Sequence, residues 1–275
     1  MTVLPSLALA ALLACVAEQS SPASPEPPAL PPHRVLATPQ DVLDVIGEIG
    51  PRILGVGELH QVVEGPQGPA AIDWFTEALL PLLAPSATDL VIETWVFGGA
   101  CGAVEEVVVE VLPQDTKRPP ETEDAIMRLA RRARELGVAP HALELSCEDY
   151  DAVVGADGEI VYEQLLGVLT RELGEYAREG LATPDARVVL YGGAVHNDLH
   201  PREALAPYSY ATSLSEPQAY LELDLYPPAM AAAQPGFDTE PWFPLLEVTG
   251  PGHVVLYQRE ERSWVLLLPS GGSPE

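Results

Sequence analysis

The sequence predicts an α/β protein with a mainly parallel β-sheet, helices on both faces, and a C-terminal β-hairpin that adds edge strands. Two observations predict this class. Short apolar runs alternate with segments of helical periodicity along most of the chain, and the last two runs are joined by a charged turn. With 275 residues, of which 47% are hydrophobic, the chain can bury one large core.

The predicted helices have recognisable ends. The first opens at Thr38, a good N-cap residue, with Pro39 in its first turn and Asp41 at its positive end. Gly50-Pro51 stops it. Three more helices are predicted over residues 69–83, 122–136 and 160–179, and a further helical segment begins near Pro201.

The predicted strands are short runs rich in Val, Ile and Leu. They cover residues 52–56, 89–94, 141–145, 187–191 and 220–225. Residues 253–268, HVVLYQREERSWVLLL, contain two β-rich runs around a charged turn and predict the hairpin. Residues 227–246 carry Pro-Pro, Pro-Gly and three aromatic residues and predict an irregular excursion.

The N-terminal part is predicted to lie outside the folded domain. Residues 1–14 have the apolar core of a signal peptide, and the LLAC sequence ending at Cys15 resembles the lipobox of bacterial lipoproteins. Residues 15–34 would then be a lipidated cysteine and a Pro-rich tether, followed by a single α/β domain over 35–275. An ordinary secretory signal is the alternative. Either signal exports the protein, and lipidation would anchor it in the bacterial cell envelope, in the periplasm or at the cell surface.

The net charge limits the kinds of partner that the protein can bind, and the cysteine content raises the question of a disulfide. A net charge of −27, from 41 acidic and 14 basic residues, argues against nucleic acid, because phosphate binding needs clustered Lys and Arg. Export places Cys101 and Cys147 in an oxidising compartment, and both follow predicted strand ends. A disulfide between them and two unrelated buried thiols are the two alternatives.

Ionisable side chains follow the predicted strands at their carboxyl ends, where ligands bind in open α/β sheets. Glu58 and His60 follow the first strand, Glu93 ends the second, and His196 and His200 follow the fourth. Glu93 closes an aliphatic run and should be partly buried, so that it needs a partner. Converging Glu and His side chains suit a divalent metal or a general base. Helix capping or loop hydrogen bonds are the alternative roles.

Three motifs resemble the erythromycin esterase/Tiki superfamily, which includes ChaN-type haem-binding lipoproteins. They are GELH ending at His60, a glutamate closing the second strand at Glu93, and GAVH ending at His196, within residues 52–225. The resemblance implies that Glu58 and His60 act as a general base or help to hold a metal. It also implies a ChaN/Tiki-like fold for the whole domain.

These residues indicate an exported hydrolase. Such an enzyme would activate a water molecule, which attacks a small-molecule or peptide substrate. No G-x-S-x-G motif and no evident Cys–His pair is present, which argues against a covalent acyl-enzyme. The predicted catalytic residues are Glu58, His60, Glu93 and His196. The candidate ligands of a divalent metal are the same four residues and His200.

The alternative function is a haem-binding surface lipoprotein of the ChaN type without catalysis. In that case haem would be held by His60, His196 or a tyrosine. Tyr191 is the candidate tyrosine, and Tyr208 and Tyr210 are further candidates by proximity in the sequence. A third possibility is a descendant that kept the fold and lost both activities.

Overall fold

The computed structural model describes residues 29–66, 70–116, 119 and 121–271. The predicted signal peptide, the predicted lipidation site Cys15 and most of the predicted tether lie outside the described residues. Within the described part, no helix is long and apolar enough to cross a membrane.

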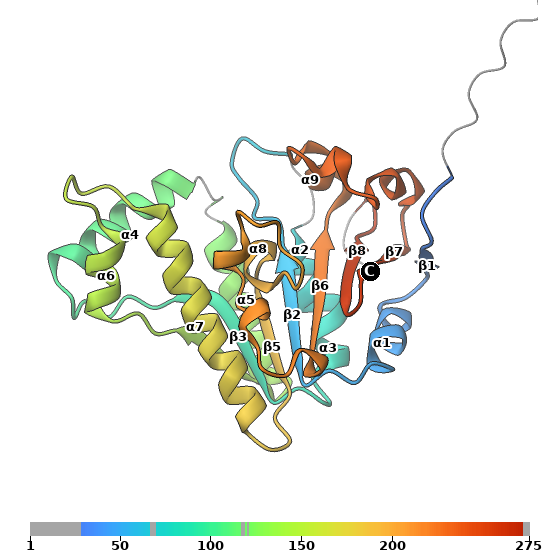
Figure 1. The fold of residues 1–275 in the computed structure, drawn as a ribbon, viewed down its shortest axis with the longest axis horizontal. Helices are drawn as coiled ribbons and strands as arrows, with labels where there is room; N and C mark the ends of the chain where they lie inside the picture. The colour runs from blue at the N-terminus through green and yellow to red at the C-terminus, as the bar shows by residue number, and fades with distance from the viewer. Residues whose placement is uncertain (1–28, 67–69, 117–118, 120, 272–275) are drawn as a thin grey trace, which may run out of the picture.

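One β-sheet organises the described part of the chain (Figure 1). Its strands are β1 (Arg34–Leu36), β2 (Ile53–Glu58), β3 (Asp89–Trp95), β4 (Ala139–Leu143), β5 (Val188–Gly193), β6 (Tyr220–Tyr226), β7 (Val254–Glu260) and β8 (Ser263–Leu267). They lie side by side in the order β1-β7-β8-β6-β2-β5-β3-β4. Five neighbouring pairs are parallel, and the β1–β7 and β7–β8 pairs are antiparallel. The predicted α/β class and the mainly parallel sheet are confirmed. The C-terminal hairpin is present as β7 and β8, but β1 pairs with β7 and takes the edge position that was expected for the hairpin.

The helices fall between the strands in the sequence. They are α1 (Pro39–Gly47), α2 (Ala71–Trp74), α3 (Leu80–Leu83), α4 (Ala103–Thr116), α5 (Glu121–Glu135), α6 (Cys147–Val153), α7 (Tyr162–Ala182), α8 (Ala194–Asn197) and α9 (Pro228–Ala233). Thr38 caps α1 as predicted, because its side chain accepts a hydrogen bond from the backbone N–H of Asp41.

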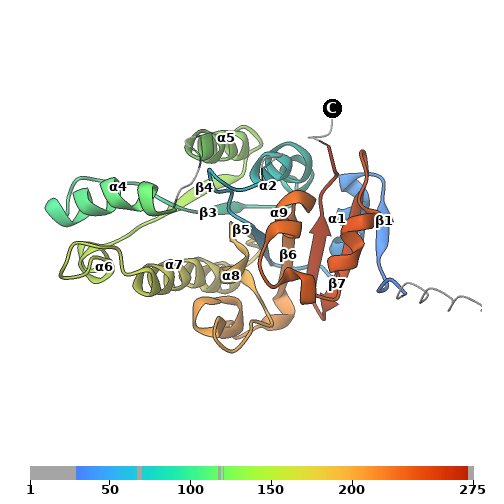
Figure 2. The same cartoon turned by 90° about the horizontal axis from the view of Figure 1, so that it is seen from above.

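Successive residues of the strands enter separate hydrophobic clusters, as the period of two requires. Leu54 of β2 packs in a cluster with α1, α2 and α5, whereas its neighbour Ile53 packs in a cluster with α6 and α7. Figure 2 shows α2 and α5 on one side of the strands and α7 on the other. This packing holds the strands rigidly, so that residues at their carboxyl ends have fixed positions.

The predicted helix over residues 69–83 is interrupted by a π-turn, Phe75–Leu79. The N–H of Leu80 donates to the carbonyl of Phe75, five residues back, immediately before Pro81. Proline has no N–H to continue the ladder, and the π-turn lies directly before it, between α2 and α3.

Several elements differ from the sequence-based expectation. The helix predicted near Pro201 is wrong: short 3₁₀ turns, the first at Ala206–Tyr208, replace it. The strand β1 and the helices α4, α6, α8 and α9 were not predicted, and α9 lies in the segment that was expected to be irregular. The third predicted strand begins two residues earlier, at Ala139, because Pro140 is tolerated on an edge strand.

A disulfide joins Cys101 to Cys147, 46 residues apart in the sequence. This is one of the two alternatives that the sequence left open. It ties the chain before α4 to the first residue of α6, at the β4 end of the sheet. In the chain-entropy model a loop of this length contributes about 4 kcal/mol to stability.

A buried ionic cluster holds the C-terminal hairpin to the sheet. Glu222 and Asp224, two residues apart on β6, are fully buried on one face. The guanidinium of Arg259 on β7 bonds to both carboxylates, at 2.5 Å for Asp224. It passes over β8 where that strand has the small residue Ser263, whose hydroxyl lies 3.1 Å from Nε of the arginine. Burial opposes the charge of Arg259, but the two carboxylates outweigh it and raise its pKa.

Arg259→Met is expected to lower the free energy of unfolding by about 3–5 kcal/mol, because it leaves two buried carboxylates without a counter-charge. Urea denaturation followed by circular dichroism measures the loss. Arg131→Met is the matched control: Arg131 is exposed on α5, and its replacement should change stability by no more than about 0.5 kcal/mol. Equal effects of the two substitutions would show that the cluster does not hold the hairpin.

Candidate active site at the carboxyl ends of the strands

Four side chains meet beyond the carboxyl ends of three neighbouring parallel strands. Glu58 is the last residue of β2, Glu93 lies near the end of β3, and His196 follows β5 on α8 (Figure 1). Because β5 lies between β2 and β3, both carboxylates flank its end. His60 lies two residues beyond Glu58 and contacts it. The sheet thus brings together residues that are far apart in the sequence.

The carboxylate of Glu58 determines which ring nitrogen of His60 carries a hydrogen atom. Nδ1 of His60 lies 3.1 Å from Oε1 of Glu58, and the other Glu58 oxygen accepts a 2.5 Å hydrogen bond from the hydroxyl of Tyr191. Burial raises the pKa of Tyr191 well above its ordinary value, and the Glu58 charge raises it further, so that the phenol stays a donor. Nδ1 of His60 therefore donates to Glu58, and Nε2 carries the lone pair in the neutral ring.

Two oxygen atoms hold the second imidazole in the same tautomer. Nδ1 of His196 lies 3.0 Å from the backbone carbonyl of Tyr208 and 2.9 Å from the hydroxyl of Thr170. A carbonyl can only accept, so Nδ1 of His196 donates and Nε2 carries the lone pair in the neutral ring. The Thr170 hydroxyl is itself held on α7, 2.7 Å from the carbonyl of Leu166.

Glu93 lies between the two imidazoles. Its Oε1 is 3.7 Å from Nε2 of His60 and 3.8 Å from Nε2 of His196. Its Oε2 accepts a 2.5 Å hydrogen bond from the backbone N–H of Gly193. The Glu93 and His196 side chains are 6% and 4% exposed, whereas that of His60 is 31% exposed. Solvent therefore reaches this Glu–His cluster through His60.

Two glycines at the end of β5 make room for these side chains. A Cβ at Gly192 would lie 2.7 Å from Cβ of Glu93 and closer still to its Oε2. A Cβ at Gly193 would lie 2.9 Å from Nε2 of His60. Both approaches are too close for carbon, so the glycines are needed for the position of Glu93 and His60.

The structure does not bring His200, a predicted metal ligand, to the Glu–His cluster. The backbone N–H of His200 donates to Asp198 at 2.8 Å. Its ring Nε2 lies 3.4 Å from the backbone carbonyl of Glu261. The turn after α8 therefore leaves this histidine on the surface, close to the hairpin that joins β7 and β8.

The three tyrosines proposed as haem ligands have other contacts. Tyr191 is buried and donates to Glu58. Tyr208 supplies its backbone carbonyl to His196. Tyr210 is buried, and its hydroxyl lies 3.3 Å from that of Tyr220. Tyr191 and Tyr210 are therefore held inside the protein, whereas the contact of Tyr208 with His196 uses its backbone.

Several residues that position the turn after β5 were not predicted to do so. The hydroxyl of Tyr220 donates to the backbone carbonyl of Asn197 at 2.6 Å, and the N–H of Leu199 donates to Glu222 at 3.0 Å. The buried acids in YLELDLY were a usable signal, since a charge in an apolar strand needs a partner. Thr170 gave no signal, because a threonine in a helix is usually exposed or back-bonded.

Comparison with known proteins gives no family. No family model matches the chain, and no curated protein matches it. A solved structure described as "The structure of the type III effector HopBA1" is similar with a TM-score of 0.44 and 15% identity, over 87% of this chain and 98% of that one. Similarity at this level carries no argument about function, and the resemblance to the erythromycin esterase/Tiki superfamily stays a prediction.

Gly192→Ala is expected to lower the free energy of unfolding by about 1–3 kcal/mol, because the added methyl group must displace the buried Glu93. Gly167→Ala is the matched control. A Cβ at Gly167, inside α7, meets nothing within 4 Å, and alanine there should stabilise by up to about 1 kcal/mol. Urea denaturation compares the two variants. A stabilising effect at both positions would contradict the role given to Gly192.

Proposed function

We propose that the protein is an exported hydrolase that activates water between His60, Glu93 and His196. The observation that carries the proposal is that Nε2 of both histidines faces the same oxygen of Glu93, at 3.7 and 3.8 Å. With hydrogen on both Nδ1 atoms, two lone pairs and a carboxylate oxygen face one another. These acceptors suit a molecule that donates two hydrogen bonds, and water is such a donor.

His60 is the general base in this proposal, because it is the exposed member of the Glu–His cluster. Its Nε2 takes a proton from water as the oxygen attacks the substrate carbonyl. The imidazolium that forms is stabilised by Glu58 at Nδ1 and by Glu93 at Nε2. It then returns the proton to the leaving group, which restores the neutral ring. Tyr191 keeps Glu58 in place throughout.

The donor set also suits a divalent cation. Among the described residues, no group of three or more His, Cys, Asp or Glu side chains is already arranged to hold a metal ion. The donor types nevertheless fit, because imidazole nitrogen and carboxylate oxygen are common ligands of catalytic zinc. Metal-binding histidines usually donate their other ring N–H to a carboxylate or carbonyl, as His60 and His196 do. A cation bound by these two and Glu93 would lower the pKa of a water molecule.

Export and lipid anchoring through Cys15 are part of the proposal. They are supported by the apolar residues 1–14 and by the LLAC sequence that ends at the cysteine. Cys15→Ser should move the protein from the membrane fraction to the soluble fraction of an expressing bacterium. An unchanged distribution would contradict lipidation at this residue.

Haem binding stays the alternative prediction. It requires a broad apolar cleft beside His60 or His196, and the crevice between His196, Leu173 and Tyr210, which borders neither Glu93 nor His60, is too small for haem. The described cavity of about 390 Å³ is lined by other residues. Titration with haem tests the alternative, since a Soret band that shifts and is lost in His60→Gln would favour binding over hydrolysis.

Glu93→Gln is expected to weaken Zn²⁺ binding, measured by isothermal titration calorimetry, by at least about 100-fold, because it removes the central carboxylate. Glu58→Gln should weaken it by about 10- to 100-fold through the orientation of His60. His200→Gln is the control and should bind like the wild type. Loss of binding in His200→Gln alone would contradict the ligand set proposed here.

His60→Gln is expected to lower kcat/KM by about 100- to 10,000-fold on whichever member of a panel of chromogenic esters and amides the wild type hydrolyses. The general base is lost, while the size and polarity of the side chain are nearly kept. His200→Gln should keep the wild-type rate. If His60→Gln keeps it too, the assignment of the base is wrong, and if the wild type hydrolyses none of the panel, the hydrolase proposal loses its support.

A further inference from the structure

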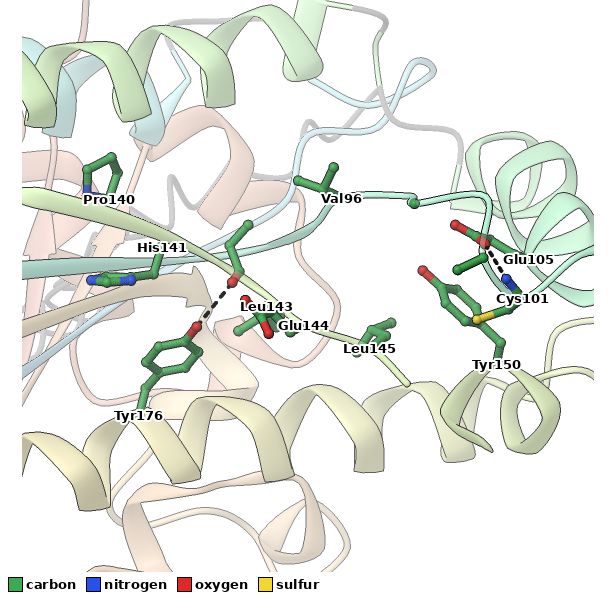
Figure 3. Close-up of a pocket in the computed structure, with 13 residues that line it drawn as sticks. Val96, Cys101, Glu105, Pro140, His141, Leu143, Glu144, Leu145, Tyr150 and Tyr176 are labelled. Carbon is green, nitrogen blue, oxygen red and sulfur yellow. Dashed lines mark hydrogen bonds between the residues drawn. The ribbon is translucent and has the colours of Figure 1, made fainter. Parts of the chain in front are cut away.

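A cavity of about 390 Å³ lies along β4, the last strand of the sheet (Figure 3). Its walls come from β4 and the two residues after it, the segment after β3, the start of α4, and one tyrosine each from α6 and α7. None of its lining residues belongs to the Glu–His cluster. The volume is in the range of small-molecule sites.

The edge of β4 is closed to an added strand. The N–H of Ala139 donates to the carbonyl of Thr88, so Ala139 faces β3, and the alternate residues Pro140 and Ala142 face the cavity. Pro140 has no N–H to offer, and the carbonyl of Ala142 already accepts a 3.3 Å hydrogen bond from the hydroxyl of Tyr176 (Figure 3). An extended peptide would find few backbone partners here, which favours a small molecule.

The cavity is negatively charged. Glu105 is nearly fully buried, and its carboxylate accepts hydrogen bonds from the backbone N–H groups of Cys101 and Gly99, at 3.0 and 2.8 Å. These bonds lower the pKa of Glu105, so that it stays ionised. A second carboxylate, Glu144, is exposed at the wall. No Lys or Arg is among the lining residues, and the ring of the lining histidine His141 bonds to a carboxylate.

Aromatic and aliphatic surface accompanies this charge. Burial, and then the charge of Glu105, raise the pKa of Tyr150 to about 12, and the pKa of Tyr176 is raised in the same way by burial and nearby carboxylates. Both rings therefore stay neutral. Val96 lines the cavity and is 77% exposed, and the partly exposed ring of Phe97 lies 6.2 Å from that of Tyr150.

We propose that this cavity binds a small organic cation, an amine or amidine carried on an aromatic or aliphatic body. The carboxylates of Glu105 and Glu144 supply the attraction, and the ring of Tyr176, the more exposed of the two lining tyrosines, adds a cation–π contact. Tyr150 is 2% exposed and forms a buried part of the wall. Val96 covers the apolar body. Anions are repelled by the same field. The inference does not depend on the proposed hydrolase activity, because the two sites share no residue.

Benzamidine and benzamide test the proposal, because they have nearly the same shape and differ in charge. Isothermal titration calorimetry of the purified protein should show that benzamidine binds about tenfold more tightly than benzamide. Raising NaCl from about 0.05 M to about 0.5 M should weaken the binding of benzamidine and leave that of benzamide unchanged. Equal affinities for the two probes, or no binding of benzamidine, would overturn the proposal.

Glu144→Gln places the binding in this cavity. The side chain is exposed, so the variant should fold, and benzamidine should bind about fivefold more weakly. Glu175→Gln, exposed on α7 and outside the cavity lining, has the same change of net charge and should bind like the wild type. Equal weakening in both variants would indicate a general charge effect and overturn the assignment. Tight binding of an oligolysine peptide without binding of benzamidine would instead indicate a docking surface for a protein.

Discussion

The position of the Glu93 carboxylate depends on the absence of a side chain at Gly192, and the rest of the Glu–His cluster depends on that carboxylate. One oxygen is held by the N–H of Gly193, so the other must face the two imidazoles. A methyl group at Gly192 would move the Glu93 carboxylate, which both histidines face. Close packing against Gly192 and the hydrogen bond from Gly193 together set the geometry of the site.

The same constraint recurs on β2. A Cβ at Gly55 would lie 2.7 Å from Cζ of Tyr220, and one at Gly57 would lie 2.8 Å from Cα of Ala194, the first residue of α8. The glycines let a tyrosine and a helix approach the strand directly, and the tyrosine hydroxyl then bonds to the carbonyl of Asn197. The turn that carries His196 therefore packs directly against the backbone of β2.

Sequence periodicity was sufficient to predict β2, β3, β5 and β6 and their carboxyl ends, and so to place Glu58, His60, Glu93 and His196 at one edge of the sheet. Parallel strands end at one edge, which makes their convergence predictable. The contact of Tyr208 with His196 was not predictable, because it uses a backbone carbonyl in a 3₁₀ turn where a helix was expected. The bonds from Arg259 on β7 to the two acids of β6 cross the intervening strand β8. Neither segment carries a local sequence pattern that predicts them.

The pairing of β1 with β7 has a mechanical consequence for a chain held by its N-terminus. Only three residues of β1 pair, and that strand is separated from β2 by β7, β8 and β6. Seven strand spacings of about 4.8 Å put it roughly 34 Å from β4. For a chain anchored at Cys15 as proposed, tension from the N-terminal side would peel β1 away first, before it reaches the strands that position the histidines.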